Sequence, residues 1–392
     1  MIIYPNLYKK FECIGGACKN TCCAGWSIPL DSDTALFYQN LDTSFGTFLR
    51  ENTYEEKGMT QIRLNEDGLC PFLNHNGLCQ VYQKCGPEHM SNTCRDFPRR
   101  SFIMGEHILR GLSLSCEAVL QLLQNDPAPV QLCFEGFCDR KHTGDMAVYE
   151  ITQYIAWGMK LLQDPTVPLG TALGTALYMG METKTHLKDQ DYLNIEDIQQ
   201  RGDSFRKEFE LAKKNITSDE LADSAWQLIL QVTDIFCEML IRCDLPQKQL
   251  LLWPEEIAIL SDSEKLQYIK NTYLEYHSHQ DTKQHLFFMR RLAALFFCSH
   301  SMGITIQESE QLFLQDICNF ILLAEILPAV CSGGKITSGN TFYPGTVTLS
   351  RFFDQTQLIT QYVWPMIKQL ISPDIITYTT AFIYLFDKPA AP

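Results

Sequence analysis

The sequence lacks an excess of positive charge. Its 392 residues carry 32 Lys and Arg against 46 Asp and Glu, a formal net charge of −14. An acidic chain does not bind the phosphate backbone of nucleic acids non-specifically, because that binding depends on clustered basic side chains. The shortage of basic residues extends over the whole chain. Residues 1–140 contain 12 basic and 16 acidic residues, and residues 141–392 contain 20 basic and 30 acidic residues. No large basic domain is hidden in the total, and we expect no nucleic-acid partner.

A long hydrophobic run and a targeting signal are also missing. The longest apolar stretch, Phe320–Cys331, contains Glu325 and Pro328 and is shorter than the ~20 residues that cross a bilayer. The N-terminal residues have no basic segment followed by an apolar one, and neither end carries a lipidation motif. We therefore expect a cytoplasmic protein with no membrane partner. An apolar fraction of 45% excludes a disordered or collagen-like chain.

Cysteine, in contrast, is abundant and unevenly placed. Eleven of the sixteen cysteines lie between Cys13 and Cys138. In a reducing compartment, clustered cysteines bind metal more often than they form a disulfide scaffold. Nine are candidate metal ligands: Cys13, Cys18, Cys22, Cys23, Cys70, Cys79, Cys85, Cys94 and Cys116. The others stand in apolar contexts where we expect packing: Cys133, Cys138, Cys237, Cys243, Cys298, Cys318 and Cys331.

The spacing of the candidate ligands bears on which metal they hold. No two cysteines have the Cys-x-x-Cys spacing typical of structural zinc, which lowers that possibility without excluding it. Iron–sulfur clusters are larger and accept more scattered thiolates, four for a cubane cluster. Arg95, Arg99 and Arg100 could balance the negative charge of such a cluster. The chemistry favours a cluster over zinc. Three histidines could replace a thiolate, although a lone histidine more often has no such role: His75, His89 and His107.

The pattern of apolar residues changes near residue 140. Before it, short apolar runs alternate with turn formers such as Asn74–Gly77, which has hairpin chemistry. We expect short strands around a metal centre there, rather than a regular sheet. After residue 145, apolar residues recur at helical spacing, most clearly within 219–242, where Ser218 is a plausible N-cap. Further helices are expected at 286–299, 308–327, 357–370 and 374–385, with breaks at 165–168 and 333–334.

The predicted fold class is therefore mainly α, with an irregular cysteine-rich N-terminal part. We expect a metal-binding domain over residues 1–140 and a helical domain over residues 145–392, the latter binding a substrate. No fixed-period repeat or low-complexity tract interrupts this division. The oligomeric state is not encoded in any pattern that we find.

Five cysteine segments occur in a characteristic order: Cys13 to Cys23, Cys70-Pro-Phe-Leu, Leu78-Cys-Gln-Val-Tyr82, Cys85-Gly-Pro87 and Cys94-Arg-Asp-Phe-Pro98. This order resembles the cysteine-rich proteins described as zinc- or iron-chelating. With the Ser-Leu-Ser-Cys116-Glu-Ala stretch and the long helical part, the chain is most similar to the flagellin lysine-N-methylase family. The resemblance covers residues 11–118. It departs from the family pattern at Cys85, which stands near a usual basic position.

The resemblance implies an enzyme that methylates lysine side chains of flagellin, its protein partner. It implies S-adenosylmethionine as the methyl donor and a [4Fe-4S] cluster in the N-terminal domain, with zinc as the alternative metal. The resemblance does not identify any catalytic residue or any residue that binds the methyl donor. Two other interpretations stay open: a non-catalytic zinc- or iron-binding module that docks proteins, and an iron–sulfur redox carrier.

Familiar signatures for S-adenosylmethionine are absent from the sequence. The glycine fingerprint of the doubly wound fold is missing, since Gly170, Gly174 and Gly180 lie in an apolar run that predicts helix packing. The Cys-x3-Cys-x2-Cys triplet of radical enzymes is incomplete, because Gly25 takes its third position. A sulfonium favours aromatic faces. Four aromatic residues could serve, although packing around the metal centre is the commoner role: Trp26, Phe72, Tyr82 and Phe97.

Overall fold

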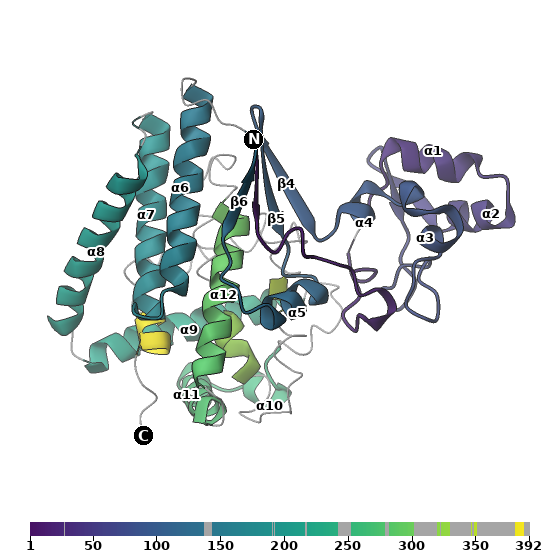
Figure 1. Ribbon diagram of the computed structural model, residues 1–392. Coiled ribbons are helices and arrows are strands. Elements are labelled where there is room, and N and C mark those ends of the chain that lie inside the picture. The colour runs from purple at the N-terminus through teal and green to yellow at the C-terminus, as the bar shows by residue number, and fades with distance from the viewer. Residues whose placement is uncertain are drawn as a thin grey trace.

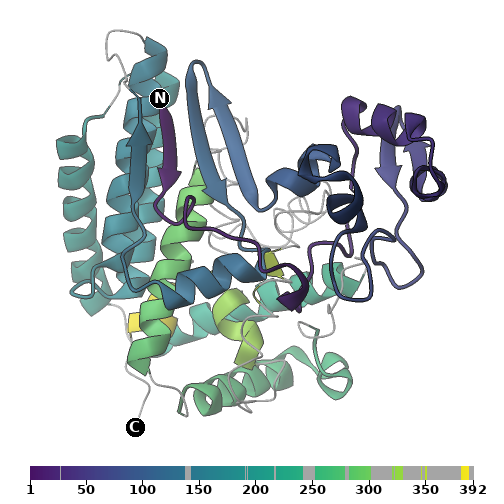
Figure 2. The ribbon, with the colours of Figure 1, turned by 45° about the vertical axis from the view of Figure 1, so that its right-hand side comes forward.

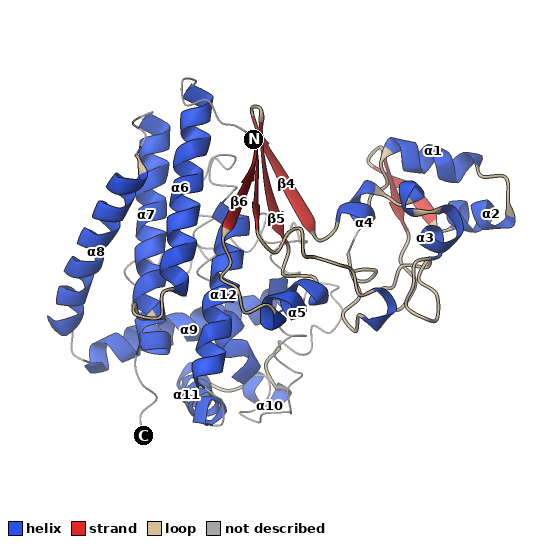
Figure 3. Cartoon of the chain, viewed as in Figure 1, coloured by secondary structure: helices blue, strands red, loops and turns tan. Residues whose placement is uncertain are grey.

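The fold is mainly helical with a small sheet formed by the N-terminal part, in a computed structural model of the chain (Figure 3). The helical class predicted from the sequence is confirmed. No helix among the described residues is both long and apolar enough to cross a membrane. The structure describes residues 1–26, 28–136, 143–189, 191, 193–215, 218–241, 252–278, 282–301, 320–321, 323–329, 346, 349–350 and 381–387.

A four-stranded sheet stands at the centre of the molecule, in the order β4-β5-β1-β6. Strand β1 runs parallel to β5 and antiparallel to β6, and β4 and β5 form an antiparallel hairpin. The expectation that no regular sheet would form was wrong. The sheet depends on β1 pairing with strands about a hundred residues further on, a contact that no local pattern encodes. Its strands are β1 (Ile2–Pro5), β4 (Arg99–Met104), β5 (His107–Leu112) and β6 (Leu132–Glu135).

Long helices pack beside and below this sheet (Figure 1). Helix α12 is the most buried of them and contacts α6, α5 and β5, with every residue from Leu292 to Ser299 inside the protein. Strands β1 and β5 share one hydrophobic core with these helices, which we call the main core. The helices are α5 (Glu117–Asn125), α6 (Thr143–Gln163), α7 (Leu169–Asp189), α8 (Ile195–Asn215), α9 (Ser218–Ile241), α10 (Glu255–Ala258), α11 (Asp262–Ser278) and α12 (Thr282–Ser301).

The predicted helices and breaks agree with the described elements. Helix α9 begins at Ser218, one residue before the start expected from the sequence, and the predicted break at 165–168 separates α6 from α7. The buried Arg290 closes that break, donating to the carbonyl oxygens of Leu162 at 3.0 Å and Val167 at 2.6 Å. The three spaced glycines lie within α7, which confirms helix packing. Predictions for 357–370 and 333–334 lie outside the described residues, as do residues 308–319 of the helix predicted at 308–327 and residues 374–380 of the helix predicted at 374–385.

Residues 28–94 form a lobe with its own small hydrophobic core, to the right of the sheet in Figures 1 and 2. We call it the small core: Ile28, Leu30, Tyr38, Leu49, Ile62, Cys70, Phe72 and Val81. Around it lie two helices capped by Asp31 and Thr43, a hairpin and two short helices. These elements are α1 (Ser32–Asn40), α2 (Ser44–Glu51), β2 (Thr53–Glu56), β3 (Met59–Ile62), α3 (Gln80–Cys85) and α4 (Asn92–Asp96).

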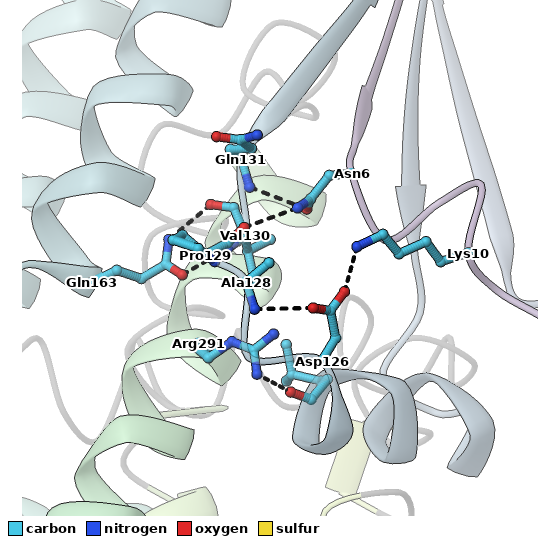
Figure 4. Close-up of polar contacts among 10 residues, drawn as sticks. Asn6, Lys10, Asp126, Ala128, Pro129, Val130, Gln131, Gln163 and Arg291 are labelled. Atoms are coloured by element: carbon cyan, nitrogen blue, oxygen red, sulfur yellow. Dashed lines mark hydrogen bonds and ion pairs between the residues drawn. The ribbon is translucent and has the colours of Figure 1, made fainter.

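The connection between α5 and β6 ties the N-terminal segment to the helices (Figure 4). Gln163 of α6 accepts from the Val130 amide and donates to the Val130 carbonyl, both at 2.8 Å. From the other side, Asn6 bonds to the backbone of the same connection. Lys10 and Asp126 form an ion pair of 2.6 Å beside it. The start of the chain is therefore fastened to the main core on both sides of this connection.

Candidate functional site

Five of the nine predicted cysteines surround the small core. Cys70 belongs to it, with 7% of its surface exposed, and four others pack against it: Cys23, Cys79, Cys85 and Cys94. Three of the thiols precede or lie within short helices. Cys79 directly precedes α3, Cys85 ends it, and Cys94 lies in α4. These five cysteines, which are far apart in the sequence, thus lie around one apolar centre.

Backbone contacts bring distant cysteines of this lobe together. The Cys70 amide donates to the Cys23 carbonyl at 2.8 Å, beside a bridge between Ala24 and Leu69. Helix α4 is held to the lobe by Ser91, which donates to the Pro29 carbonyl at 2.7 Å. These contacts join the first cysteine group to the second, which lies some fifty residues later.

The predicted turn at Asn74–Gly77 also takes part in this arrangement. The Asn74 side chain accepts from the amides of Asn76 and Leu78 at 2.9 and 3.0 Å, which confirms the turn. Gly16 packs so closely on it that a Cβ there would lie 2.3 Å from the Asn76 carbonyl oxygen. A glycine is required at this contact because the two backbones touch. Its role is to bring the first cysteine segment against the second.

The thiols of the lobe influence one another electrostatically. Burial raises the pKa of Cys70 to about 12, and the neighbouring Cys23 and Cys79 add to the effect. Burial also raises the pKa of Cys94, with contributions from Cys23, Cys70 and Cys79. In each case a second negative charge nearby disfavours the thiolate. Four sulfurs, of Cys23, Cys70, Cys79 and Cys94, therefore share one neighbourhood, and Tyr38 lies within reach of the last three.

A second group of thiols lies at the start of α5. Burial raises the pKa of Cys18 to about 12, and Glu117 and Cys116 raise it further. Cys22 is near both groups, because its pKa is raised by Cys23 and burial and, to a smaller extent, by Cys94 and Cys116. The nine candidates are thus divided by the fold, with Cys22 between the two groups. Cys13 is exposed, and its sulfur accepts from the Gly15 amide at 3.4 Å.

Glu117 is the residue of this site that sequence reasoning missed. Its buried carboxylate accepts from the amides of Lys19 and Asn20 at 2.9 and 2.8 Å and from the Asn20 side chain at 2.9 Å. The Cys18 sulfur lies 3.6 Å from the same oxygen. Glu117 therefore fixes the loop between Cys18 and Cys22. Its position directly after Cys116 was the signal that could have revealed it.

Other residues that were considered as ligands or charge partners have different contacts. His89 stacks on Phe37 with ring centroids 3.7 Å apart, His107 is buried in β5, and His75 is exposed. Arg99 lies over the rings of Tyr8 and Phe11 rather than over the lobe. Among the described residues, no three His, Cys, Asp or Glu side chains meet as closely as a single bound metal ion requires.

Phe72, Cys237 and Cys298 follow the commoner expectation of packing, whereas Tyr82 does not. Phe72 is 1% exposed and packs on Tyr38 and Phe48, as a core residue does. Tyr82 is 55% exposed. Cys237 and Cys298 are buried in the main core, which confirms their packing role, and Cys133 lies half-buried in β6. The remaining predicted packing cysteines lie outside the described residues: Cys138, Cys243, Cys318 and Cys331.

The fold and site define a mainly helical protein with a thiol-lined lobe, and known proteins share part of its sequence. The chain is 33% identical over 134 residues to the Lysine-N-methylases of Salmonella typhimurium and Salmonella choleraesuis. The match covers 33% of this chain and 33% of each relative. The chain is also 33% identical over 134 residues to the Flagellar biosynthetic protein FliU of Salmonella muenchen, over 79% of that protein.

These relatives place the chain in a family, because most of one of them is matched. The chain belongs to the flagellin lysine methylase family, which includes the proteins named Lysine-N-methylase and FliU. The matched segment spans a third of the length of the two Lysine-N-methylases. No family model matches the chain, and no solved structure matches it.

Proposed function

We propose that this protein is a protein-lysine N-methyltransferase that uses S-adenosylmethionine and acts on flagellin. Two observations support the proposal. The chain belongs to the family of proteins named Lysine-N-methylase and FliU, and five of its nine candidate cysteines lie around one small core. The family membership is the observation that supports the proposed activity. The placement of the cysteines supports the proposed metal centre.

The proposed reaction transfers one methyl group to a lysine amine. A lysine with the ordinary pKa of about 10.4 is protonated at neutral pH and has no lone pair to react. After loss of that proton, the amine nitrogen forms a bond to the methyl carbon, and the carbon–sulfur bond of the sulfonium breaks. The sulfonium becomes a neutral thioether, and a proton leaves the methylated nitrogen. A site for this reaction must therefore disfavour the ammonium, by burial or by hydrogen bonding to the neutral amine.

Four thiols are the set we propose to hold a [4Fe-4S] cluster: Cys23, Cys70, Cys79 and Cys94. Their chemistry fits the group, because soft thiolates are the ligands of iron–sulfur clusters. They are half-buried or buried, they belong to one neighbourhood, and burial by the small core limits access of water to it. A bound cluster would supply positive iron charge that stabilises thiolates, offsetting the raised pKa values of Cys70, Cys79 and Cys94. Cys18 and Cys116 lie with Glu117 and are left out of the set.

The experiment that tests the proposal combines metal content with activity. The full-length protein is purified without oxygen, and iron, sulfide and zinc are measured per chain. It is then incubated with S-adenosylmethionine and flagellin, and lysine methylation is measured by mass spectrometry. We expect iron and sulfide in equal amounts and mass increments of one methyl group on lysines. A fully loaded protein that transfers no methyl group would reject the enzyme and favour a metal-binding docking module. Zinc without sulfide would show that the metal centre is a zinc site and not an iron–sulfur cluster.

A further inference from the structure

Two arginines are neighbours on one face of the sheet, in the hairpin nearest the small lobe (Figures 1 and 2). In this hairpin of β4 and β5, Arg99 pairs with Leu112 and Ser101 pairs with Arg110. Paired residues of adjacent strands point to the same face, and so do alternate residues along one strand. Arg99 and Arg110 are therefore diagonal neighbours on one face, and both are half-buried.

Both guanidinium groups stack on the same aromatic ring. The guanidinium carbon of Arg99 lies 5.6 Å from the centre of the Tyr8 ring, and that of Arg110 lies 5.5 Å from it. Arg99 also lies 4.8 Å from the centre of the Phe11 ring. Stacking uses the flat face of a guanidinium, so the N–H groups at its edge stay available for paired hydrogen bonds with an anion such as a carboxylate.

These N–H groups have few acceptors in the part of the chain that the structure describes. Arg99 donates to the Phe11 carbonyl at 3.3 Å. The Nε atom of Arg110 is buried and has no hydrogen-bond partner among the described residues. Neither arginine forms an ion pair with a carboxylate of those residues. A buried donor without an acceptor costs free energy, so an unpartnered guanidinium nitrogen indicates a missing acceptor.

Glu135 of β6 does not supply that acceptor. Its pKa is lowered most by Lys9, then by Tyr4 and least by Arg110. The Glu135 carboxylate is bonded to Lys9 and accepts from the Tyr4 hydroxyl at 3.0 Å. Arg110 is therefore left without a paired carboxylate. In a chain with a net charge of −14, two half-buried cations of this kind indicate a site for an anion.

The arginine pair is also close to the cysteines. Phe97 precedes Arg99 by two residues, and its ring centre lies 6.0 Å from that of Trp26. The Trp26 indole donates to the Cys22 carbonyl at 2.6 Å, next to the thiols of both groups. An aromatic pair thus connects the arginines to the cysteines. Aromatic faces attract a sulfonium, and guanidinium groups bind a carboxylate.

We propose that Arg99 and Arg110 bind the carboxylate of S-adenosylmethionine, and that the aromatic pair of Trp26 and Phe97 attracts its sulfonium. This inference deepens the proposed function, on which the identity of the ligand rests. A carboxylate and a sulfonium in one molecule match two guanidinium groups beside an aromatic pair. The unpartnered Nε of Arg110 would donate to a carboxylate oxygen. The donor would then be held at the junction of the sheet and the small lobe.

Binding is measured by titration calorimetry on the full-length protein, purified without oxygen and with its metal in place. The ligands are S-adenosylmethionine, S-adenosylhomocysteine, which keeps the carboxylate, and methylthioadenosine, which lacks the whole amino-acid end. Arg110→Gln and Arg99→Gln should each raise Kd for the first two ligands about tenfold, because a charge-assisted contact is lost. The Kd of methylthioadenosine should stay unchanged. Arg110→Lys keeps the charge without the planar fork and should cause a smaller rise.

Arg63→Gln is the matched control. Arg63 also stacks on a tyrosine, 5.0 Å from the centre of the Tyr54 ring, but it lies in the small lobe and away from the proposed site. This variant should bind all three ligands as wild type does. Circular dichroism checks the folding of each variant, and Arg110→Lys gives the same comparison if Arg110→Gln does not fold.

Two results would overturn this assignment. Wild-type affinity for S-adenosylmethionine in both glutamine variants would remove the arginines from the donor site. An equal loss of affinity for all three ligands would mean that the arginines support the fold and do not recognise the carboxylate. A wild-type protein that binds no S-adenosylmethionine would reject the proposed function itself. Binding that is insensitive to the arginine variants would reject this site alone.

Discussion

The small lobe and the helical body differ in how much apolar material holds them together. The body has a main core that joins β1, β5 and most of the long helices. The lobe of residues 28–94 encloses only eight buried apolar residues, one of which is Cys70. Domains of this size bury a smaller share of their surface than larger ones and commonly need a metal or cross-link for stability. The thiols are concentrated where the apolar core is smallest.

This difference leads to the prediction that the cysteines stabilise the lobe by holding a metal centre. In the body, Cys237 and Cys298 are small buried apolar residues that add to an already large core. In the lobe, burial raises the pKa values of Cys70, Cys79 and Cys94, and neighbouring thiols raise them further, so ionisation of these three thiols is disfavoured. A bound metal centre would remove that conflict. The comparison therefore predicts that the two regions respond differently to loss of metal.

The largest expected effect comes from Cys70→Ser and Cys94→Ser. Each variant should lose most of the iron and sulfide of the proposed cluster and open the lobe to proteolysis within residues 28–94, because the proposed cluster would no longer cross-link the small core. The helical body should stay resistant. Metal content and limited proteolysis measure both effects. The matched control is Cys298→Ala in the main core, which should keep its iron. Full iron retention in either lobe variant would remove that cysteine from the ligand set.

Glu117→Ala should have the next largest effect, at the junction of the two regions. It leaves the amides of Lys19 and Asn20 without their acceptor, which costs about 3 kcal/mol of unfolding free energy. Denaturant unfolding measures the loss. Gln121→Ala removes a single bond to the other carboxylate oxygen and should cost no more than about 1 kcal/mol. Equal costs for the two variants would contradict the assigned role of Glu117.

Glu150 tests the helical body by its pH dependence. Burial and the nearby Asp191 raise the pKa of Glu150 to about 7, against an opposing effect of the Leu193 amide. The pKa of Glu150 in the folded state exceeds the ordinary value of 4.5. The contribution of Glu150 to the free energy of unfolding is therefore complete below pH 4.5 and is lost as the pH rises through 7. Glu150→Gln should remove this dependence and gain about 2 kcal/mol above pH 7. Urea unfolding across this pH range measures it, and parallel curves for both proteins would refute the assignment.

Lys10→Met is expected to have the smallest effect. Its ion pair with Asp126 fastens the N-terminal segment beside the main core (Figure 4), but the Lys10 side chain is 48% exposed. Pairs of this kind contribute about 0.5 kcal/mol and weaken with salt. Thermal unfolding at low and high salt should differ slightly for wild type and not for the variant. A loss comparable to that of Glu117→Ala would mean that the connection matters more than its exposure indicates.

The sequence was sufficient for the features that depend on local pattern. Helical periodicity located α9 and α12, the proline-rich break separated α6 from α7, and the Asn74–Gly77 turn formed as its composition predicts. The cysteine order also led to the family, which the relatives support. Each of these features is carried by residues close together in the chain, so the local sequence contains the necessary information. The boundary near residue 140 and the ligand assignments stay predictions.

Only the tertiary structure decided which distant residues meet. It paired β1 with β5 and β6 to make a regular sheet, and it separated Cys18 and Cys116 from the thiols around Cys70. It also placed Glu117 on the backbone of a loop nearly a hundred residues earlier. Cysteine number and spacing were fixed by the sequence itself. Their division into groups required packing, because long-range contacts depend on how two hydrophobic cores close and not on any local pattern.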